Sequence, residues 1–253
     1  MKTPLSIVGI IPARYGSTRL SAKPLIDLCG KPMIQHVYER ALKAGLLQSV
    51  VVATDHQSIA DTVAGFGGTA VMTPAELPTG SDRIAHVASS LDKADIIVNI
   101  QGDEPLIVPG MIDEAIRGVT EDPSAQVGTL IREITSAADL SNPGIVKVVV
   151  AGDGRALYFS RSPIPHIRDV RQPELWHTHH RYFKHIGLYV YRKSVLLQFA
   201  RWGEGPLERA ERLEQLRFLE HNIAITTRVT KHDSVPVDTP EDADRVRAIL
   251  KQN

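Results

Sequence analysis

The run Ser6-Ile7-Val8-Gly9-Ile10-Ile11, followed directly by Pro12-Ala13-Arg14-Tyr15-Gly16, decides how this chain can fold. Two further apolar runs, at residues 49–54 and 95–100, have the same character. Continuous stretches of β-branched residues without polar alternation are typical of parallel strands that are buried on both faces. These three segments are therefore predicted to form the centre of a parallel sheet.

Helical patterns separate these strands, at residues 33–45, 58–66 and 83–91. Their apolar residues recur at three- and four-residue spacing, as on one buried face of a helix. Alternation of strands and helices at this rhythm predicts βαβ units and an open, mostly parallel α/β sheet. In such sheets ligands bind beyond the carboxyl ends of the strands. The loops that follow the strands are therefore where we expect a site.

The second half of the chain has a different pattern. Residues 145–150 and 155–160 flank Ala151-Gly-Asp-Gly154, which predicts a hairpin. Further strands are expected at 185–191 and 223–229, and helices at 193–201, 206–220 and 240–250. We expect a single domain, 1–253, in which 1–150 and 223–253 form the α/β core and 151–222 is an insertion.

Composition excludes several classes of protein. The 253 residues carry 29 Lys and Arg against 29 Asp and Glu, a formal net charge of zero. A nucleic-acid-binding surface needs a net cationic field, so any anion site in this chain must be local. No apolar run approaches the about 20 residues of a membrane-spanning helix. The single cysteine, Cys29, fits a reducing compartment. We expect a cytoplasmic protein without a membrane or nucleic-acid partner.

The loop after the first strand carries three cations, Arg14, Arg19 and Lys23, around small residues. Guanidinium groups bind phosphate in a bidentate fork, and an ammonium acts as a point charge. A single cation here would be read as part of a solvated loop, but three after a buried strand favour phosphate binding. Neither Gly-x-Gly-x-x-Gly nor a Walker loop is present, which argues against a dinucleotide oxidoreductase and a P-loop NTPase.

Two carboxylates follow strand-like runs, Asp103 in Gln101-Gly102-Asp103 and Asp238 in Val237-Asp238-Thr239. Mg²⁺ is usually bound by one or two carboxylates together with substrate phosphates. Asp103 could instead serve a turn, and Asp238 could belong to the acidic first turn of a helix. Asp238 becomes a metal ligand only if the fold brings it beside Asp103.

Six short motifs occur along the chain, and both their residues and their order are informative. They are Pro12-Ala-Arg-Tyr-x-Ser-x-Arg-Leu-x-x-Lys-Pro24, Ala53-Thr-Asp-His56, Thr79-Gly-Ser-Asp-Arg83, Gln101-Gly-Asp-Glu-Pro105, Ala156-Leu-Tyr-Phe-Ser-Arg161 and Val237-Asp-Thr-Pro-Glu-Asp242. In this set and order the chain resembles the CMP-Kdo synthetases, the 3-deoxy-manno-octulosonate cytidylyltransferases, from about residue 7 to residue 250.

The resemblance implies an open, Rossmann-like nucleotidyltransferase sheet with an inserted subdomain for sugar binding and dimerisation, in a homodimer. The implied reaction transfers CMP from CTP to the anomeric hydroxyl of Kdo and releases pyrophosphate, for lipopolysaccharide synthesis. A related 8-amino sugar, another nucleotide-sugar synthetase and a non-catalytic nucleotide sensor remain alternatives. The sensor would be expected to lack Lys23, Asp103 or Asp238, and all three are present.

By matching positions, the resemblance also implies a role for individual residues. Arg14, Lys23, Asp103 and Asp238 would be catalytic, with Mg²⁺ held by the two aspartates. The nucleotide would be bound by Ala13, Arg14, Arg19, Lys23, Thr79, Gly80, Arg83 and Gln101. The sugar acid would be bound by Arg161, His185, Tyr189, Glu214 and Gln215. Ser21-Ala22 departs from the Pro-Gly that is usual at this place in the family, which puts the stiffness of the phosphate loop in doubt.

Several of these residues have a plainer interpretation. Arg161 could be a surface charge at a strand end, Tyr189 a half-buried core residue, and Glu214 and Gln215 part of a solvated helix face. Asp55 is expected to cap the helix at 58–66. The histidines at 177, 179, 180 and 185 do not have the spacing of a standard zinc site.

Overall fold

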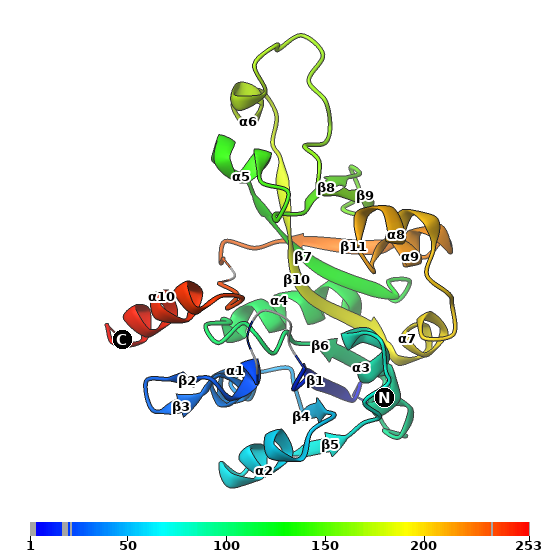
Figure 1. Cartoon of the computed structure of the whole chain (residues 1–253). Helices are drawn as coiled ribbons and strands as arrows, with labels where there is room; N and C mark the ends of the chain where they lie inside the picture. Colours follow the sequence, from blue (N-terminus) through cyan, green and yellow to red (C-terminus); the bar gives the residue numbers. More distant parts are fainter. Residues whose placement is uncertain (1–3, 17–19, 21, 234, 253) are drawn as a thin grey trace. The chain divides into compact units, whose positions relative to one another are not determined.

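The computed structural model describes residues 4–16, 20, 22–233 and 235–252. The chain divides into two compact units, which Figure 1 shows with their elements labelled. The first unit comprises 1–113, 190–200 and 234–253, and the second comprises 114–189 and 201–233. Both units contain helices and strands. The fold as a whole is mixed α/β with an open, mostly parallel sheet, as the sequence predicts.

The first unit is built on parallel strands that are the apolar runs of the sequence. They are β1 (Ile7–Ala13), β4 (Ser49–Thr54), β5 (Ala70–Met72) and β6 (Ile96–Asn99), in the order β6-β1-β4-β5. Strand β1 pairs in parallel with β4 and β6, and β5 pairs in parallel with β4 (Figure 1, blue to green). The side chains of β1, β4 and β6 are almost all buried. The three predicted central strands are therefore confirmed.

Helices of the first unit follow the predicted alternation. They are α1 (Met33–Ala41), α2 (Gln57–Gly65), α3 (Gly80–Ser89), α7 (Lys193–Phe199) and α10 (Pro240–Leu250). The shorter elements of this unit are η1 (Lys23–Leu25), β2 (Asp27–Leu28) and β3 (Lys31–Pro32). Helix α4 (Pro109–Thr120) begins in the first unit and ends in the second.

The parallel strands of the first unit end along one edge of their sheet. Register places Ala13 of β1 opposite Thr54 of β4. The segments that leave this edge begin with Arg14 after β1 and Asp55 after β4, and Gln101 follows β6 closely. Ligands in open α/β sheets bind beyond this edge, and the chain places its candidate polar residues there.

The second unit contains β7 (Val127–Glu133), β8 (Lys147–Val150), β9 (Ala156–Ser160), β10 (Phe183–Arg192) and β11 (Ile225–Val229). Strand β7 lies between β11 and β10, while β8 pairs with β10 and β9. The pairing of β8 with β9 is antiparallel, so the predicted hairpin is confirmed. The last three residues of β10 belong to the first unit.

Short helices complete the second unit. They are α5 (Ala137–Ser141), η2 (Pro173–Leu175), α6 (Trp176–His179), α8 (Pro206–Glu211) and α9 (Leu216–Glu220). Across the described residues of both units, every helix is too short or too polar to cross a bilayer.

The boundaries between the units differ from the expected ones at 150/151 and 222/223. Residues 114–150 and 223–233 group with the hairpin and not with the first unit. The reason is strand pairing, because β11 pairs in parallel with β7 from Ile225↔Val127 to Val229↔Ile131. Pairing partners of this kind are decided by tertiary structure, and the apolar pattern of a strand does not name them.

The single helix predicted at 206–220 is wrong, because the structure has α8 and α9 with a link between them. Arg212 adopts a left-handed conformation, with φ of 54°, which ends α8. The Arg161 guanidinium donates to the carbonyl oxygens of Glu211 at 2.7 Å and Arg212 at 3.3 Å. A cationic side chain on the last carbonyls is a recognised way to end a helix. The periodicity of the leucines could not reveal it.

Candidate active site

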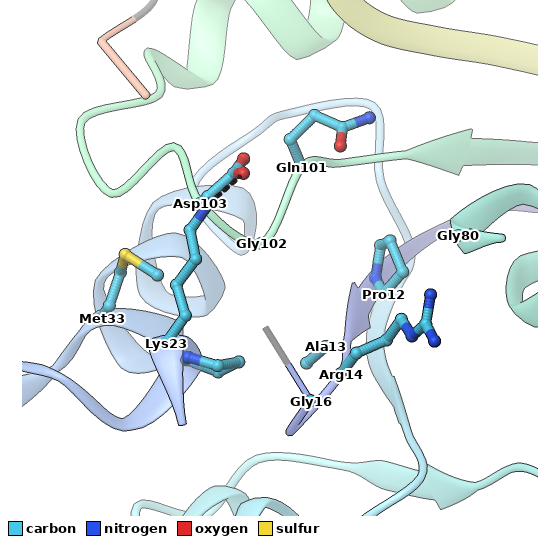
Figure 2. A pocket seen from close by; sticks show the side chains of 11 residues that line it. Pro12, Ala13, Arg14, Gly16, Lys23, Met33, Gly80, Gln101, Gly102 and Asp103 are labelled. Carbon is cyan, nitrogen blue, oxygen red and sulfur yellow. Dashed lines mark hydrogen bonds and ion pairs between the residues drawn. The ribbon is translucent and has the colours of Figure 1, made fainter. Parts of the chain in front are cut away.

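A cavity of about 420 Å³ lies at the carboxyl edge of the first unit's sheet. Its lining comes from the loop after β1, from η1, from the starts of α1 and α3, and from the segment after β6 (Figure 2). The lining residues are Pro12, Ala13, Arg14, Gly16, Lys23, Pro24, Met33, Gly80, Gln101, Gly102 and Asp103. The predicted nucleotide-binding residues Ala13, Arg14, Lys23, Gly80 and Gln101 are thus brought together with Asp103.

Lys23, Asp103 and Asp238, called here the Lys23 cluster, meet beside this cavity. Lys23 Nζ donates to Asp103 Oδ2 at 2.7 Å and to Asp238 Oδ1 at 2.8 Å. Figure 2 shows the contact with Asp103. Burial favours the neutral amine, but the two carboxylates outweigh it and raise the pKa of Lys23 above 10.5. Lys23 is therefore an ammonium at every physiological pH.

A backbone contact brings Asp238 to Asp103, which are distant in sequence. Val237 N–H donates to the carbonyl oxygen of Asp103 at 2.9 Å. The Val237 side chain is fully buried in a cluster with Leu28 and Met33. Apolar burial of one residue thus fixes the carboxylate of the next, which satisfies the condition that the sequence left open.

Asp242, and not Asp238, takes part in capping the start of α10. Asp242 accepts hydrogen bonds from the amides of Asp238 at 3.1 Å and Thr239 at 3.0 Å. Thr239 Oγ1 accepts from the Asp242 amide in return, which completes a capping box. Asp242 therefore fills the capping role, and the Asp238 carboxylate contacts Lys23.

Two backbone features shape the cavity wall. A Cβ atom on Gly102 would lie 2.7 Å from the Pro12 carbonyl oxygen, so only glycine lets the segment after β6 approach β1 this closely. Ala22, directly before Lys23, has φ of 50° and ψ of 35°, a left-handed conformation that costs an L residue about 1–2 kcal/mol. The unusual Ala22 therefore stands at a position that suits glycine. Arg19 and Ser21 lie outside the described residues.

Arg14 and the start of α3 form the opposite wall. The exposed Arg14 donates through Nη1 to the carbonyl oxygen of Pro78 at 3.1 Å, and its side chain lies near Gly80 in Figure 2. Thr79 Oγ1 accepts from the Asp82 amide at 3.2 Å and so caps α3. The Thr79 hydroxyl is thus used to cap the helix, while its neighbour Gly80 lines the cavity.

Asp55 is a residue that sequence reasoning assigned to the wrong role. The cap of α2 is His56, whose side chain accepts from the Ser58 amide. Asp55 instead accepts the Tyr15 amide at 3.1 Å and pairs with Arg83 Nη2 at 3.1 Å. Its carboxylate therefore joins the loop after β1 to α3. The Ala53-Thr-Asp motif was the signal that could have flagged it.

The partner of Asp55, Arg83, is fully buried. Desolvation lowers the pKa of Arg83 below its usual value, and the charge of Asp55 opposes this effect. Nη1 contacts Thr73 Oγ1 and lies 3.4 Å from the Pro74 carbonyl oxygen. Arg83 Nε has no hydrogen-bond partner among the described residues.

The predicted sugar-acid residues all lie in the second unit. Arg161 donates to the Glu211 and Arg212 carbonyls and, through Nη1, to the Pro143 carbonyl at 3.1 Å. Glu214 and Gln215 lie in the link between α8 and α9 and not on a helix face. Gln215 is 7% exposed, and its Nε2 has no partner among the described residues.

His185 and Tyr189 stand on β10 with ring centroids 5.1 Å apart. His185 also packs edge-on against Phe159 at 5.3 Å, and its Nε2 lies 3.0 Å from Thr129 Oγ1. Desolvation lowers the pKa of His185 to about 3, so the ring is neutral at physiological pH. A neutral imidazole beside a buried tyrosine offers hydrogen bonds but no charge.

Other histidines of the second unit are packed against aromatic rings. His166 meets Trp176 edge-on at 4.7 Å, and His180 meets Tyr182 edge-on at 5.1 Å. Within the described parts of the chain, no group of three His, Cys, Asp or Glu side chains gathers as a metal site. The pair Asp103 and Asp238 has the oxygen ligands and the charge that suit Mg²⁺ when substrate phosphates complete the shell.

Comparison with known proteins identifies the family. Residues 8–225 match the family described as Cytidylyltransferase. The chain belongs to this family. The 3-deoxy-manno-octulosonate cytidylyltransferase of Geobacter metallireducens is 52% identical over 246 residues, which is 96% of each chain. That of Geobacter sulfurreducens is 49% identical over 251 residues, covering 98% of this chain and all of the relative.

Solved structures of cytidylyltransferases agree with this result. A CMP:2-keto-3-deoxy-manno-octonic acid synthetase complexed with CTP superposes with a TM-score of 0.90 at 45% identity, covering 98% of this chain and 99% of the other. A 4-diphosphocytidyl-2C-methyl-D-erythritol synthase from Anaerococcus prevotii, at 11% identity and a TM-score of 0.64, covers 98% of this chain and 100% of the other, and shares the fold. The resemblance to CMP-Kdo synthetases inferred from the six motifs is confirmed.

Proposed function

We propose that this chain is a 3-deoxy-manno-octulosonate cytidylyltransferase, which transfers CMP from CTP to Kdo and releases pyrophosphate. The observation that carries the proposal is the Lys23 cluster beside the cavity at the carboxyl edge of the sheet. Identity of about half over nearly the full length to curated enzymes of this name supports the choice of nucleotide and sugar.

The reaction is an in-line displacement at the α-phosphorus of CTP. The anomeric oxygen of the sugar forms the new P–O bond, the bond to pyrophosphate breaks, and the hydroxyl proton is lost. Catalysis of such transfers is chiefly positioning and stabilisation of charge. A bound Mg²⁺ would stabilise phosphate charge and lower the pKa of the attacking hydroxyl.

The chain's own residues supply the rest of this chemistry. Lys23 and Arg14 stand at the cavity as two cations for the triphosphate, and Arg19 is proposed to join them. Asp103 and Asp238 would hold the Mg²⁺ ion. Gly80, Ala13 and Gln101 line the cavity where the nucleoside is proposed to bind, and Thr79 and Arg83 stand on either side of Gly80 in sequence at the start of α3.

The sugar site is proposed in the second unit, on Arg161, His185, Tyr189, Glu214 and Gln215. Support comes from the buried amide of Gln215, a hydrogen-bond donor without a described partner, of the kind that a polyhydroxylated ring can satisfy. The Arg161 guanidinium already donates hydrogen bonds to three backbone carbonyl oxygens. Arg161 would therefore have to give up backbone contacts to bind the sugar carboxylate.

We propose that the enzyme supplies CMP-Kdo for lipopolysaccharide synthesis in the cytoplasm, as a homodimer. The single cysteine fits a reducing compartment. Size-exclusion chromatography with light scattering should give about twice the 27.8 kDa of one chain. A monomer that is fully active would refute the homodimer.

Pyrophosphate release from CTP tests the function directly. Three parallel reactions contain Kdo, the 8-amino analogue or no sugar, each with Mg²⁺. The proposal expects release with Kdo that exceeds release with the analogue and with no sugar. Preference for the 8-amino sugar would correct the substrate, and absence of release with every sugar acid would reject the function.

A further inference from the structure

The Lys23 ammonium lies between the two carboxylates that are the proposed ligands of Mg²⁺. Its Nζ is 2.7 Å from Asp103 Oδ2 and 2.8 Å from Asp238 Oδ1. These are direct, charge-assisted hydrogen bonds, which leave no space for a second cation between the same two oxygen atoms. In this structure the position between the carboxylates is therefore already filled by a cation of the chain itself.

Charge and exposure show that a cation from solvent could replace this ammonium. Two carboxylates match the charge of a divalent cation, whereas one ammonium supplies half of that charge. The side chains of Asp103 and Asp238 are each 33% exposed, while that of Lys23 is 13% exposed. Solvent thus reaches the carboxylates more readily than it reaches the lysine that bridges them.

Lys23 also has a second place for its charge. Lys23 and Asp103 both line the 420 Å³ cavity, which the proposed function gives to CTP. A lysine carries a compact point charge on a flexible four-carbon stem. Rotation about its side-chain bonds is enough to take the ammonium from the carboxylates toward a triphosphate in the same cavity.

We propose that Asp103 and Asp238 form one cation site with two alternative occupants, the Lys23 ammonium in the free protein and a divalent metal in the nucleotide-bound protein. The inference rests on the proposed function for the destination of the ammonium. Lys23 leaves the carboxylates when the metal binds, and its charge becomes available to the triphosphate. Metal binding and CTP binding therefore favour each other, by the same factor in both directions.

Metal binding to the nucleotide-free protein tests the competition. Mn²⁺ replaces Mg²⁺ as the probe, and free Mn²⁺ is counted by electron paramagnetic resonance. Lys23→Gln removes the competing ammonium, so Mn²⁺ should bind at least about tenfold more tightly than to the wild type, or about 1.4 kcal/mol. The matched control is Lys31→Gln, which breaks an ion pair of 2.7 Å with Glu39 in the same unit and should leave Mn²⁺ affinity unchanged.

Unchanged or weaker Mn²⁺ binding by Lys23→Gln would overturn the proposal. The double variant Lys23→Gln with Asp103→Asn locates the gain, because the tighter binding should be lost when one ligand is removed. A gain that survives in the double variant would place the ion elsewhere and would equally reject the shared site. Circular dichroism verifies that each variant is folded.

A measurement on the wild type avoids substitution altogether. Acylation of lysine amines, read by mass spectrometry, should be slow at Lys23 in the free protein, because the ammonium is buried and paired. Saturating Mg²⁺ should raise the rate at Lys23 several-fold, with Lys31 as the internal reference. A rate at Lys23 that stays constant or falls contradicts the exchange. Neither measurement uses the sugar, so a failed pyrophosphate assay and a failed exchange are separate results.

Discussion

The Lys23 cluster of the first unit and the surroundings of Arg161 in the second unit use similar side chains in different ways. In the cluster an ammonium faces two carboxylates, and both Lys23 and Asp103 line a cavity that can hold a ligand. Around Arg161, the guanidinium donates to three backbone carbonyls, and Glu211 accepts from Ser160 Oγ at 2.6 Å and from the Arg161 amide at 3.0 Å.

The difference lies in what each charge is used for. Side chains that satisfy the backbone at helix and strand ends are committed to the fold, because an unmade buried hydrogen bond costs about 1–3 kcal/mol. Side chains that pair with other side chains, as Lys23 does with Asp103 and Asp238, can exchange partners when a ligand arrives. The charged side chains of the Lys23 cluster can therefore turn to a ligand, whereas Arg161 would have to give up backbone contacts to bind a sugar acid.

Asp103→Asn is expected to have the largest effect of these substitutions. A small effect would contradict the contrast between the Lys23 cluster and the surroundings of Arg161. Loss of one carboxylate charge removes a proposed metal ligand, so kcat for pyrophosphate release should fall roughly 100- to 1,000-fold. The measurement is steady-state turnover across a Mg²⁺ titration. Asp61→Asn, on the exposed face of α2 where the carboxylate accepts only from Gln57 among the described residues, should keep wild-type turnover. Unchanged turnover in Asp103→Asn would reject the metal assignment.

Asp55→Asn should cost the most stability. The change leaves Arg83 as a buried cation without its carboxylate, and breaking a buried ion pair costs about 3–5 kcal/mol. Urea unfolding measures the loss in the free energy of unfolding. Glu39→Gln breaks the exposed pair with Lys31 and should cost less than about 1 kcal/mol. Equal losses in the two variants would show that burial of Arg83 does not decide the value of its partner.

Arg161→Ala probes the other side of the comparison. Three hydrogen bonds to carbonyls are lost, so the free energy of unfolding should fall by about 2 kcal/mol. A sugar role would add a rise in KM for Kdo with KM for CTP unchanged. Arg155→Ala, which removes an exposed pair with Asp153, is the control and should cost less than about 1 kcal/mol. A kinetic change confined to CTP would show that Arg161 does not bind the sugar carboxylate.

His185 should make stability depend on pH. Its pKa is lowered to about 3 in the folded chain, and it is about 6.5 when unfolded. Between these values the unfolded state binds one more proton, so stability falls as pH drops below 6.5. The slope is at most about 1.4 kcal/mol per pH unit, reduced by the residual exposure of the ring.

Urea unfolding between pH 5 and 6.5 measures that slope. His185→Asn should flatten it, and His86→Asn, at an exposed position on α3, should not. A slope that survives in His185→Asn would contradict the account of a desolvated imidazole and would remove the contrast between this ring and the charged first unit.

Ala22→Gly should give the smallest effect, and with the opposite sign. Glycine adopts the left-handed conformation of residue 22 without strain, so the free energy of unfolding should rise by about 1 kcal/mol. Thermal unfolding measures the gain. Ala60→Gly, inside α2, should instead lose about 1 kcal/mol. Destabilisation by Ala22→Gly would mean that the loop before Lys23 depends on stiffness more than on freedom from strain.

Much of the fold could be predicted because it depends on local patterns of apolar residues in the sequence. The runs at 6–11, 49–54 and 95–100 became β1, β4 and β6, since burial on both faces demands continuous apolar residues. The boundaries of the units and the break at Arg212 could not be predicted. Both depend on partners distant in sequence, namely the pairing of β7 with β11 and the Arg161 guanidinium.

The site shows the same division between local and distant information. The cations of the first loop and the carboxylate of Asp103 were evident as residue types after buried strands. Asp55 was misassigned because its partners, Arg83 and the Tyr15 amide, come from other segments. No local pattern distinguishes a carboxylate that caps its own helix from one that crosses to another.

The sequence by itself determined the parallel strands, the edge where they end and the kinds of charge found there, because apolar periodicity and residue type are local properties. Only the tertiary structure decided which charges meet. The hydrogen bond from Val237 to Asp103 and the burial of Val237 bring Asp238 across 135 positions of sequence to the same ammonium as Asp103. Packing of one apolar side chain thus set the geometry of a charged site that composition alone, with a net charge of zero, could not show.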